Sequence, residues 1–226
     1  MGTRTVERIA RSRARRVTTP CRGEVTHPVE APEELLQTLT RVSSALRDGE
    51  VPFALTGGCA IYARGGPASE HDVDVLVRPQ DVEVAQQAME NRGMSTVEPP
   101  EDWLVKAFDG DRLVDIIHRP NEYPVTDAVL KEAEELRVGP ASVPVMPATH
   151  LLVDKLLVLG PHRCDMSQLL PTARALREQI DWDAVRRDTE HSPYAEAFLL
   201  LVERLGITEI RIQEAAEDPE RGKEPN

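Results

Sequence analysis

The alternation of hydrophobic and polar residues divides the chain into a front half of mixed helices and strands and a helical back half. Residues 32–48 carry leucine and valine at spacings of three and four, which predicts an amphipathic helix with one buried face. Short apolar runs bounded by glycine, proline or charged residues predict strands. These runs lie at residues 51–56, 72–77, 103–108 and 112–118, with a further β-like segment at 136–145.

Helical periodicity fills the segments between these strands and continues after Met146-Pro147. The expected fold class is α+β, in which a mixed sheet with flanking helices is followed by a helical C-terminal part. We expect the sheet unit to span residues 31–146 and the helical subdomain to span residues 147–213. The predicted helices lie at 59–64, 78–91 and 125–135 in the front half, and at 149–159, 165–179, 182–189 and 193–205 in the back half.

The two ends of the chain lack the apolar residues that a packed core requires. Residues 1–30 form a basic head, whose first 23 residues hold seven arginines and one glutamate. We expect this head to be an unpacked tail or an over-long start. An arm that binds nucleic acid or a partner, and an organelle transit peptide, are the alternatives. Residues 214–226 are charged, contain two prolines and are expected to be flexible.

The net charge, the number of cysteines and the length of the apolar runs limit the classes to which the protein can belong. The chain has 226 residues and a net charge of −12, which argues against a broad surface for nucleic acid. It contains three cysteines, too few and odd in number for a disulfide framework, so a reducing, cytoplasmic location is the simplest interpretation. No apolar run approaches the roughly 18 residues that a membrane span needs, so no membrane partner is expected.

Three aspartates are the first candidates for chemistry. Asp72 and Asp74 alternate with valines on one predicted strand, so both carboxylates should leave the same face of the sheet. Asp115 interrupts the apolar run of a later strand, where an acid is costly to bury unless a cation pairs with it. Three carboxylates converging from neighbouring strands would form an all-oxygen site suited to Mg²⁺. Alternating acids on an edge strand that faces water are the plainer alternative.

A glycine pair precedes the acids. Gly57-Gly58 follows the predicted strand that ends at Thr56 and precedes a short helix. Glycines at such a position let the backbone approach a phosphate, and free N–H groups at the helix start can bind it. A simple turn remains the alternative for the pair taken alone.

In combination, Gly57-Gly58, Asp72-Val73-Asp74 and Asp115 resemble the pattern of the nucleotidyltransferase superfamily related to DNA polymerase beta. Residues 55–77 are especially similar to small bacterial members, which include antibiotic nucleotidyltransferases and the toxins of toxin–antitoxin pairs. The resemblance covers residues 35–205 and implies a nucleotidyltransferase-like mixed sheet. It also implies that Lys155, on a helix of the back half, reaches the phosphates of the nucleotide.

The chain departs from the superfamily pattern at several positions. Gly58 stands where many relatives carry serine, so backbone must replace a hydroxyl contact to phosphate. His71 is the one basic residue in the loop before the acids. Cys164 replaces a common lysine within Arg163-Cys164-Asp165. We expect Trp103 and Trp182 to be core residues, with platforms on which a nucleotide base stacks as the alternative.

The resemblance implies an enzyme that transfers a nucleoside monophosphate from an NTP, such as ATP, to a hydroxyl acceptor and releases pyrophosphate. It implies that Asp72, Asp74 and Asp115 are catalytic and bind two Mg²⁺ ions, with Asp115 completing the second metal site or acting as base. The implied nucleotide-binding residues are Thr56, Gly57, Gly58, His71 and Lys155.

The acceptor is left open by the sequence. A cationic small molecule such as an aminoglycoside suits an acidic body, whereas a toxin would act on tRNA or protein and would have an antitoxin partner. The alternative to catalysis is a nucleotide-binding regulatory protein that keeps the same fold.

Overall fold

A computed structural model describes residues 33–69 and 72–208 of the chain. The expected basic tail at 1–30, the expected flexible tail at 214–226 and His71 lie outside the described residues. The strands are β1 (Phe53–Thr56), β2 (Asp72–Val77), β3 (Ser95–Val97), β4 (Leu104–Asp109), β5 (Arg112–Ile117), β6 (Glu134–Val138) and β7 (Ala141–Val145). The α-helices are α1 (Glu33–Asp48), α2 (Gly57–Ala63), α3 (Val82–Glu90), α4 (Asp127–Leu130), α5 (Ala148–Leu157), α6 (Leu170–Leu176), α7 (Trp182–Asp188) and α8 (Pro193–Arg204).

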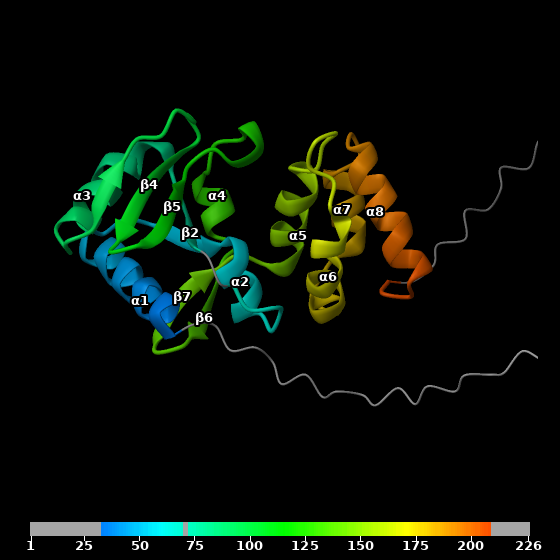
Figure 1. Cartoon of the computed structure of the whole chain (residues 1–226), viewed down its shortest axis with the longest axis horizontal. Helices are drawn as coiled ribbons and strands as arrows, with labels where there is room; N and C mark the ends of the chain where they lie inside the picture. Colours follow the sequence, from blue (N-terminus) through cyan, green and yellow to red (C-terminus); the bar gives the residue numbers. More distant parts are fainter. Residues whose placement is uncertain (1–32, 70–71, 209–226) are drawn as a thin grey trace, which may run out of the picture.

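The strands form one mixed sheet in the order β3-β4-β5-β2-β1-β7-β6. The pairs β2/β5 and β1/β7 are parallel, and the other neighbours are antiparallel. Figure 1 shows this sheet with helices around it, followed by the helices α5 to α8, and so confirms the expected α+β class.

The valines of β2 form the centre of the core. Val73, Val75 and Val77 are fully buried, while Asp72 and Asp74 alternate with them toward the opposite face, as the strand period requires. Helix α1 covers the valine side with a stripe that includes Leu35, Leu39, Val42 and Leu46. The burial of these apolar side chains is the main favourable term that fixes β2 at the middle of the sheet.

Several elements differ from those that the sequence predicts. The segment 136–145 is not one strand but the hairpin β6–β7, whose turn places Gly139 at a φ of 58°, a conformation that glycine adopts easily. The expected helix at 125–135 shortens to α4, because β6 begins at Glu134. The edge strand β3 was not expected, since its three residues are too short to show a period.

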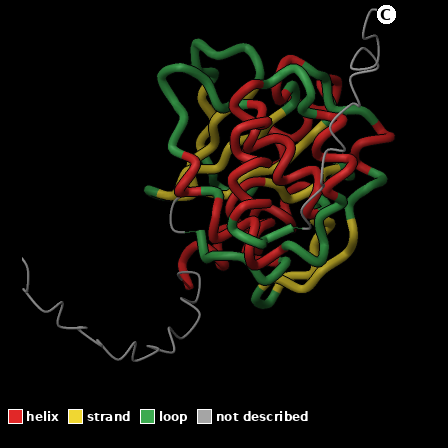
Figure 2. The backbone as a smooth tube through the Cα atoms, turned by 90° about the vertical axis from the view of Figure 1, so that its right-hand side faces the viewer, coloured by secondary structure: helices red, strands yellow, loops and turns green. Residues whose placement is uncertain are grey.

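The helical part packs beside the sheet through α5. Leu151, Leu152 and Leu156 of this helix are fully buried, and Phe198 of α8 is the largest buried side chain behind it. Figure 2 looks from the helical end and shows helices in front of the strands. No helix in the described ranges is long and apolar enough to cross a membrane.

Arg64 fixes the connection between the sheet and α5. Its side chain is 6% exposed and donates to the carbonyl oxygens of Val145, at 3.0 Å, and Met146. The same guanidinium pairs with Glu134 of β6, and the carbonyl of Arg64 accepts from Gln179 in the helical part. Because β7 leads directly into α5, this arginine holds the start of α5 against the end of α2.

Candidate active site

The site begins as a row of residues across four strands. The register pairs Thr56 of β1 with Asp74 of β2, Asp74 with Asp115 of β5, and Asp115 with Lys106 of β4. Directly opposed residues in a sheet point to the same face. The sheet therefore presents a hydroxyl, two carboxylates and an ammonium side by side, with Asp72 one pleat away on β2.

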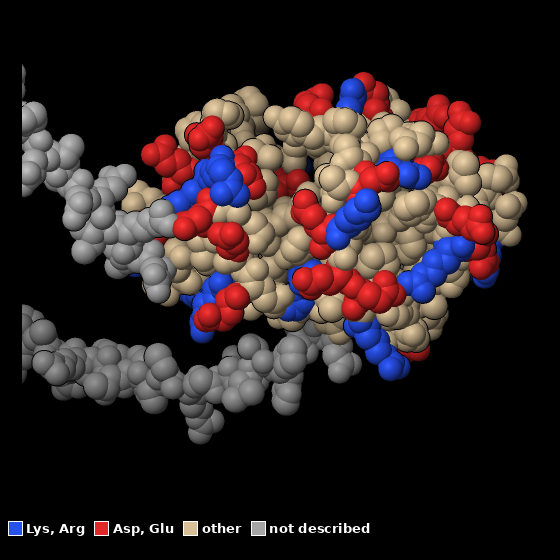
Figure 3. All heavy atoms as spheres, turned by 180° about the vertical axis from the view of Figure 1, so that it is seen from behind, with Lys and Arg blue, Asp and Glu red and all other residues tan. Residues whose placement is uncertain are grey.

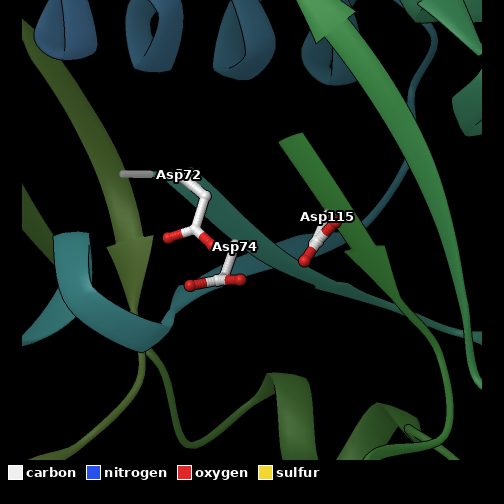
Figure 4. Close-up of side chains that lie close together, drawn as sticks. All are labelled: Asp72, Asp74 and Asp115. Atoms are coloured by element: carbon white, nitrogen blue, oxygen red, sulfur yellow. The ribbon is translucent and has the colours of Figure 1, made fainter. Parts of the chain in front are cut away.

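The three predicted acids meet in space. Each of Asp72, Asp74 and Asp115 offers a carboxylate oxygen, and these oxygens lie within 4.8 Å of one another. Figure 4 shows the carboxylates of β2 and β5 turned toward a common space. The structure thus brings together the residues that the sequence marks as catalytic.

Burial, with the neighbouring negative charges, raises the pKa of two of these acids. Burial is the main cause for Asp74, followed by the negative charges of Asp72 and Asp115, and its pKa rises from 3.8 to about 7. Lys155 and a hydrogen bond from the backbone of Gly58 act in the opposite direction. Burial also raises the pKa of Asp115, against the ion pair with Lys106, whose Nζ lies 3.4 Å from Oδ1. Burial and the repulsion between neighbouring carboxylates therefore both oppose ionisation of the cluster.

The glycine turn is shaped by contact with Asp74. Gly57 has a φ of 61°, and a Cβ at this position would lie 1.8 Å from Oδ2 of Asp74. Any side chain here would displace the central carboxylate, so glycine is required both by backbone conformation and by space. A Cβ at Gly58 would lie 2.4 Å from Oγ of Ser69. Ser69 thus fills the place where the side chain of a residue at position 58 would lie.

A cavity of about 400 Å³ opens beside the acids, between the sheet and α5. Thr56, Gly57 and Asp74 line one side, and Lys155 and Arg163 line the helical side. Lys155 thus lies close enough to lower the pKa of Asp74 by charge attraction. This places the two halves of the chain on opposite walls of one cavity.

The end wall of the cavity is the short 3₁₀ turn η2 (Pro120–Glu122) that follows β5. Asn121 and Glu122 have φ values of 50° and 69°, which are unusual for residues other than glycine. The side-chain amide of Asn121 donates to Oδ1 of Asp154 on α5 at 3.0 Å. Backbone in sparsely populated conformations persists where its surroundings hold it, and is concentrated at functional sites.

The sequence did not single out several residues of the site. Trp103 is 37% exposed and lines the cavity, so the expectation that it belongs to the core is wrong. It lies just before β4, outside the apolar core. Arg119, Asn121 and Asp154 also line the cavity, and no local pattern marks them.

The sequence motifs also do not mark Lys106 as a site residue, although the register of the hairpin would have placed it beside Asp115. The turn at Gly110-Asp111 pairs Asp109 with Arg112. Three residues farther from the turn on each strand, Lys106 is paired with Asp115. The loop residue His71, expected to bind nucleotide, lies outside the described residues.

The donor set fits a hard divalent cation. It consists of three carboxylates, from the described parts of β2 and β5, with no histidine or cysteine among them. Oxygen ligands of this kind suit Mg²⁺ or Mn²⁺ and not Zn²⁺. Burial, and after it the charges of Asp72 and Asp115, raise the pKa of Asp74, and a bound cation would offset the repulsion among these acids.

Sequence comparison agrees with the geometry of the site. Residues 26–205 match the family described as "Uncharacterised nucleotidyltransferase". The chain belongs to this family. The expected enzyme class, a nucleotidyltransferase, is therefore confirmed. No curated protein matches the sequence.

Solved structures with a similar fold share few residues with this chain. The antibiotic-resistance factor ANT(2'')-Ia is 16% identical, with a TM-score of 0.46 over 76% of this chain and 92% of that one. The lincosamide antibiotic adenylyltransferase LnuA, with lincomycin bound, is 13% identical, with a TM-score of 0.45 over 63% and 95%. An antigenic nucleotidyltransferase-like protein from Paracoccidioides brasiliensis is 15% identical, with a TM-score of 0.44 over 77% and 90%. All three scores are below 0.5, so the assignment rests on the family match and the site.

The raised pKa of Asp74 predicts an unusual pH dependence of stability. The folded state binds this proton more tightly than the unfolded state, so the contribution of Asp74 to stability falls as the pH rises from about 4 to about 7. Above about pH 7 the loss of stability that comes from ionising Asp74 is complete. We expect Asp74→Asn, in EDTA, to be more stable than the wild type by about 1–3 kcal/mol at pH 8. This difference should disappear near pH 4.

Urea unfolding at several pH values measures this difference. Asp48→Asn is the matched control, because Asp48 is an exposed acid that pairs with Arg92 at the surface. A constant difference between wild type and Asp74→Asn from pH 4 to pH 8 would contradict the assigned pKa.

The contact between Gly57 and Asp74 predicts a second effect. Gly57→Ala and Gly110→Ala place alanine at φ values of 61° and 63°, but open space surrounds a Cβ only at Gly110. We expect Gly110→Ala to cost about 1–2 kcal/mol of backbone strain. Gly57→Ala should cost about 1–3 kcal/mol more, because Asp74 must leave its position. Urea unfolding of both variants measures the difference, and equal losses would show that Gly57 serves the turn alone.

Proposed function

We propose that the protein transfers a nucleoside monophosphate from an NTP to a hydroxyl acceptor in a reaction that depends on Mg²⁺. The observation that carries this proposal is the cluster of Asp72, Asp74 and Asp115 beside a cavity that also contains Lys155. Clustered acids on a sheet, with a cation across a cavity, are suited to holding a polyphosphate through metal ions. The family match supports the reaction class.

The three acids would hold the metal. Asp72 and Asp74 would bind a cation that also contacts the phosphates, and Asp115 would complete a second site or take the proton of the acceptor hydroxyl. When bound, Mg²⁺ would neutralise phosphate charge and polarise the transferred group. The sheet contributes by holding the carboxylates in register, so that little rearrangement is needed when substrate binds.

Other residues of the cavity would bind and orient the nucleotide. Lys155 would neutralise the departing pyrophosphate from the helical side, as a charge fixed in place before the reaction. Gly57 and Gly58 would bring backbone close to the phosphates. The apolar residues Leu76, Ile117 and Leu151 line the same cavity and would exclude water from the nucleoside.

The net charge of the protein and its distribution over the surface help to identify the class of acceptor. Outside the first 23 residues the chain carries about −18 of charge, since the whole carries −12 and the head about +6. Figure 3 shows acidic and basic side chains interspersed over the described residues on that face, with no broad basic area in view. Such a surface favours a small cationic acceptor, such as an aminoglycoside, over tRNA, which needs several phosphate contacts.

A toxin that modifies tRNA or protein is the second candidate for the acceptor class. It would require the basic head or a partner to supply contacts with nucleic acid, and an antitoxin to control it. A non-catalytic nucleotide sensor is the alternative outside catalysis. Turnover separates an enzyme of either acceptor class from a sensor, because a sensor would bind NTP without releasing pyrophosphate.

The test is incubation with each α-labelled NTP and Mg²⁺, with aminoglycosides, total tRNA and total protein offered as acceptors. We expect label on one acceptor class, and none with Asp74→Asn or in excess EDTA. Transfer by Asp74→Asn at the wild-type rate would refute the assigned site. NTP binding without transfer to any acceptor would favour the sensor.

Lys155 provides a separate test of the nucleotide side of the cavity. Lys155→Ala should raise KM for NTP and lower kcat/KM by about 10–100-fold, the scale of one lost charge-assisted contact. Lys155→Arg, which keeps the charge, is the matched control and should retain most of the activity. Steady-state kinetics with the labelled NTP gives both constants. Wild-type kinetics in Lys155→Ala would remove the helical part from the site.

A further inference from the structure

Lys106 occupies a special position among the charges of the site. It lies directly opposite Asp115 in the β4–β5 pairing, and its Nζ is 3.4 Å from Oδ1 of that carboxylate. The side chain of Asp115 is 13% exposed and that of Lys106 is 32% exposed, so the pair is only partly screened by water. Among the described residues, no other lysine or arginine is ion-paired with the three acids.

The other charged groups around Asp115 are negative. Asp72 and Glu101 both raise its pKa, and Asp74 lies beside it in the same row of the sheet. Lys155 acts on Asp74 from the cavity side and is a separate cation on a separate element. Lys106 is therefore the side chain that balances Asp115, from the β4 side of that carboxylate and on the same face of the sheet.

We propose that Lys106 is a positioning residue that holds Asp115 in the metal-free protein and weakens the affinity of the acid cluster for a divalent cation. The inference rests on the proposed function, because it takes the acids as the metal site. A cation that binds Asp115 must compete with the ammonium for Oδ1 and remain close to a fixed positive charge. Both effects make the free energy of metal binding less favourable.

This arrangement has a consequence for the order of binding. An NTP brings several negative charges to the cluster, and these offset the repulsion between Lys106 and the metal. The lysine therefore favours metal that arrives together with nucleotide over metal alone. It also orders the carboxylate of Asp115 before substrate binds, which reduces the reorganisation needed afterwards.

The test measures Mn²⁺ binding to the full chain without nucleotide, by titration calorimetry at pH 8. Lys106→Met should bind Mn²⁺ about tenfold more tightly than the wild type, the scale expected for one nearby, partly screened charge. Lys106→Arg keeps the charge and should remain within about twofold of the wild type. Lys131→Met, which removes an exposed lysine at the end of α4, should also remain within about twofold.

Unchanged or weaker Mn²⁺ binding in Lys106→Met would overturn the proposal, and so would equal tightening in Lys131→Met, which would indicate only a change in net charge. The Lys106→Arg variant guards against misfolding, since it must reproduce the wild type if charge is what matters.

Asp115→Asn separates failure of this inference from failure of the proposed function. It should weaken Mn²⁺ binding at least tenfold, and in the double variant the effect of Lys106→Met should be smaller than in the wild type, because the competition for Oδ1 is gone and only the repulsion between the ammonium and the metal remains. If Asp72→Asn, Asp74→Asn and Asp115→Asn all leave Mn²⁺ binding unchanged, the metal site itself is wrong. If those variants lose the metal but Lys106→Met binds as the wild type does, only the role of Lys106 is wrong.

Discussion

The pairing of β1, β2, β5 and β4 is the constraint on which the site depends. It fixes Thr56, Asp74, Asp115 and Lys106 in one row, so the carboxylates cannot move apart without breaking the ladder of backbone hydrogen bonds. Burial, and then the repulsion between carboxylates held this close, raises the pKa of Asp74 to about 7. The buried valines on the opposite face of β2 provide the stabilisation that offsets it.

The residues around this row show how the backbone adapts to it. Gly57 passes so close to Asp74 that only glycine fits, and the left-handed residues Asn121 and Glu122 turn the chain back into the cavity after β5. Both departures from ordinary backbone geometry lie within contact of the cavity. Local rules of sequence and structure are most often broken at functional sites, where a particular placement of groups outweighs the conformational cost.

Those local rules also explain how much could be predicted from the sequence. The acids of β2 were identifiable because the strand period alone puts Asp72 and Asp74 on one face. Lys106 needed the register of the hairpin at Gly110-Asp111, which the spacing could have supplied. Trp103 depended on packing between distant parts of the chain, which no pattern in one segment contains.

The same distinction holds for the fold. The helix α1 and strand β2 have long or regular periods and were predicted almost to the residue. The apolar pattern of residues 136–145 predicts one strand in place of the hairpin β6–β7, because it does not reveal the turn at Gly139. Strand β3 forms through pairing with β4 and not through its own three residues, so tertiary contact decides its existence.

The two lysines at the site, Lys106 and Lys155, come from different parts of the fold. Lys106 belongs to the sheet, and the strand register sets its distance from Asp115. Lys155 belongs to α5, so its distance from Asp74 depends on how the helical part docks against the sheet. Arg64 controls that docking, because it binds the carbonyls of Val145 and Met146 just before α5 begins. The sheet thus holds the three carboxylates together with one cation, while the second cation comes from a helix that packs on the same core. A shift of α5 would change the Lys155 side of the cavity and leave the acid cluster intact.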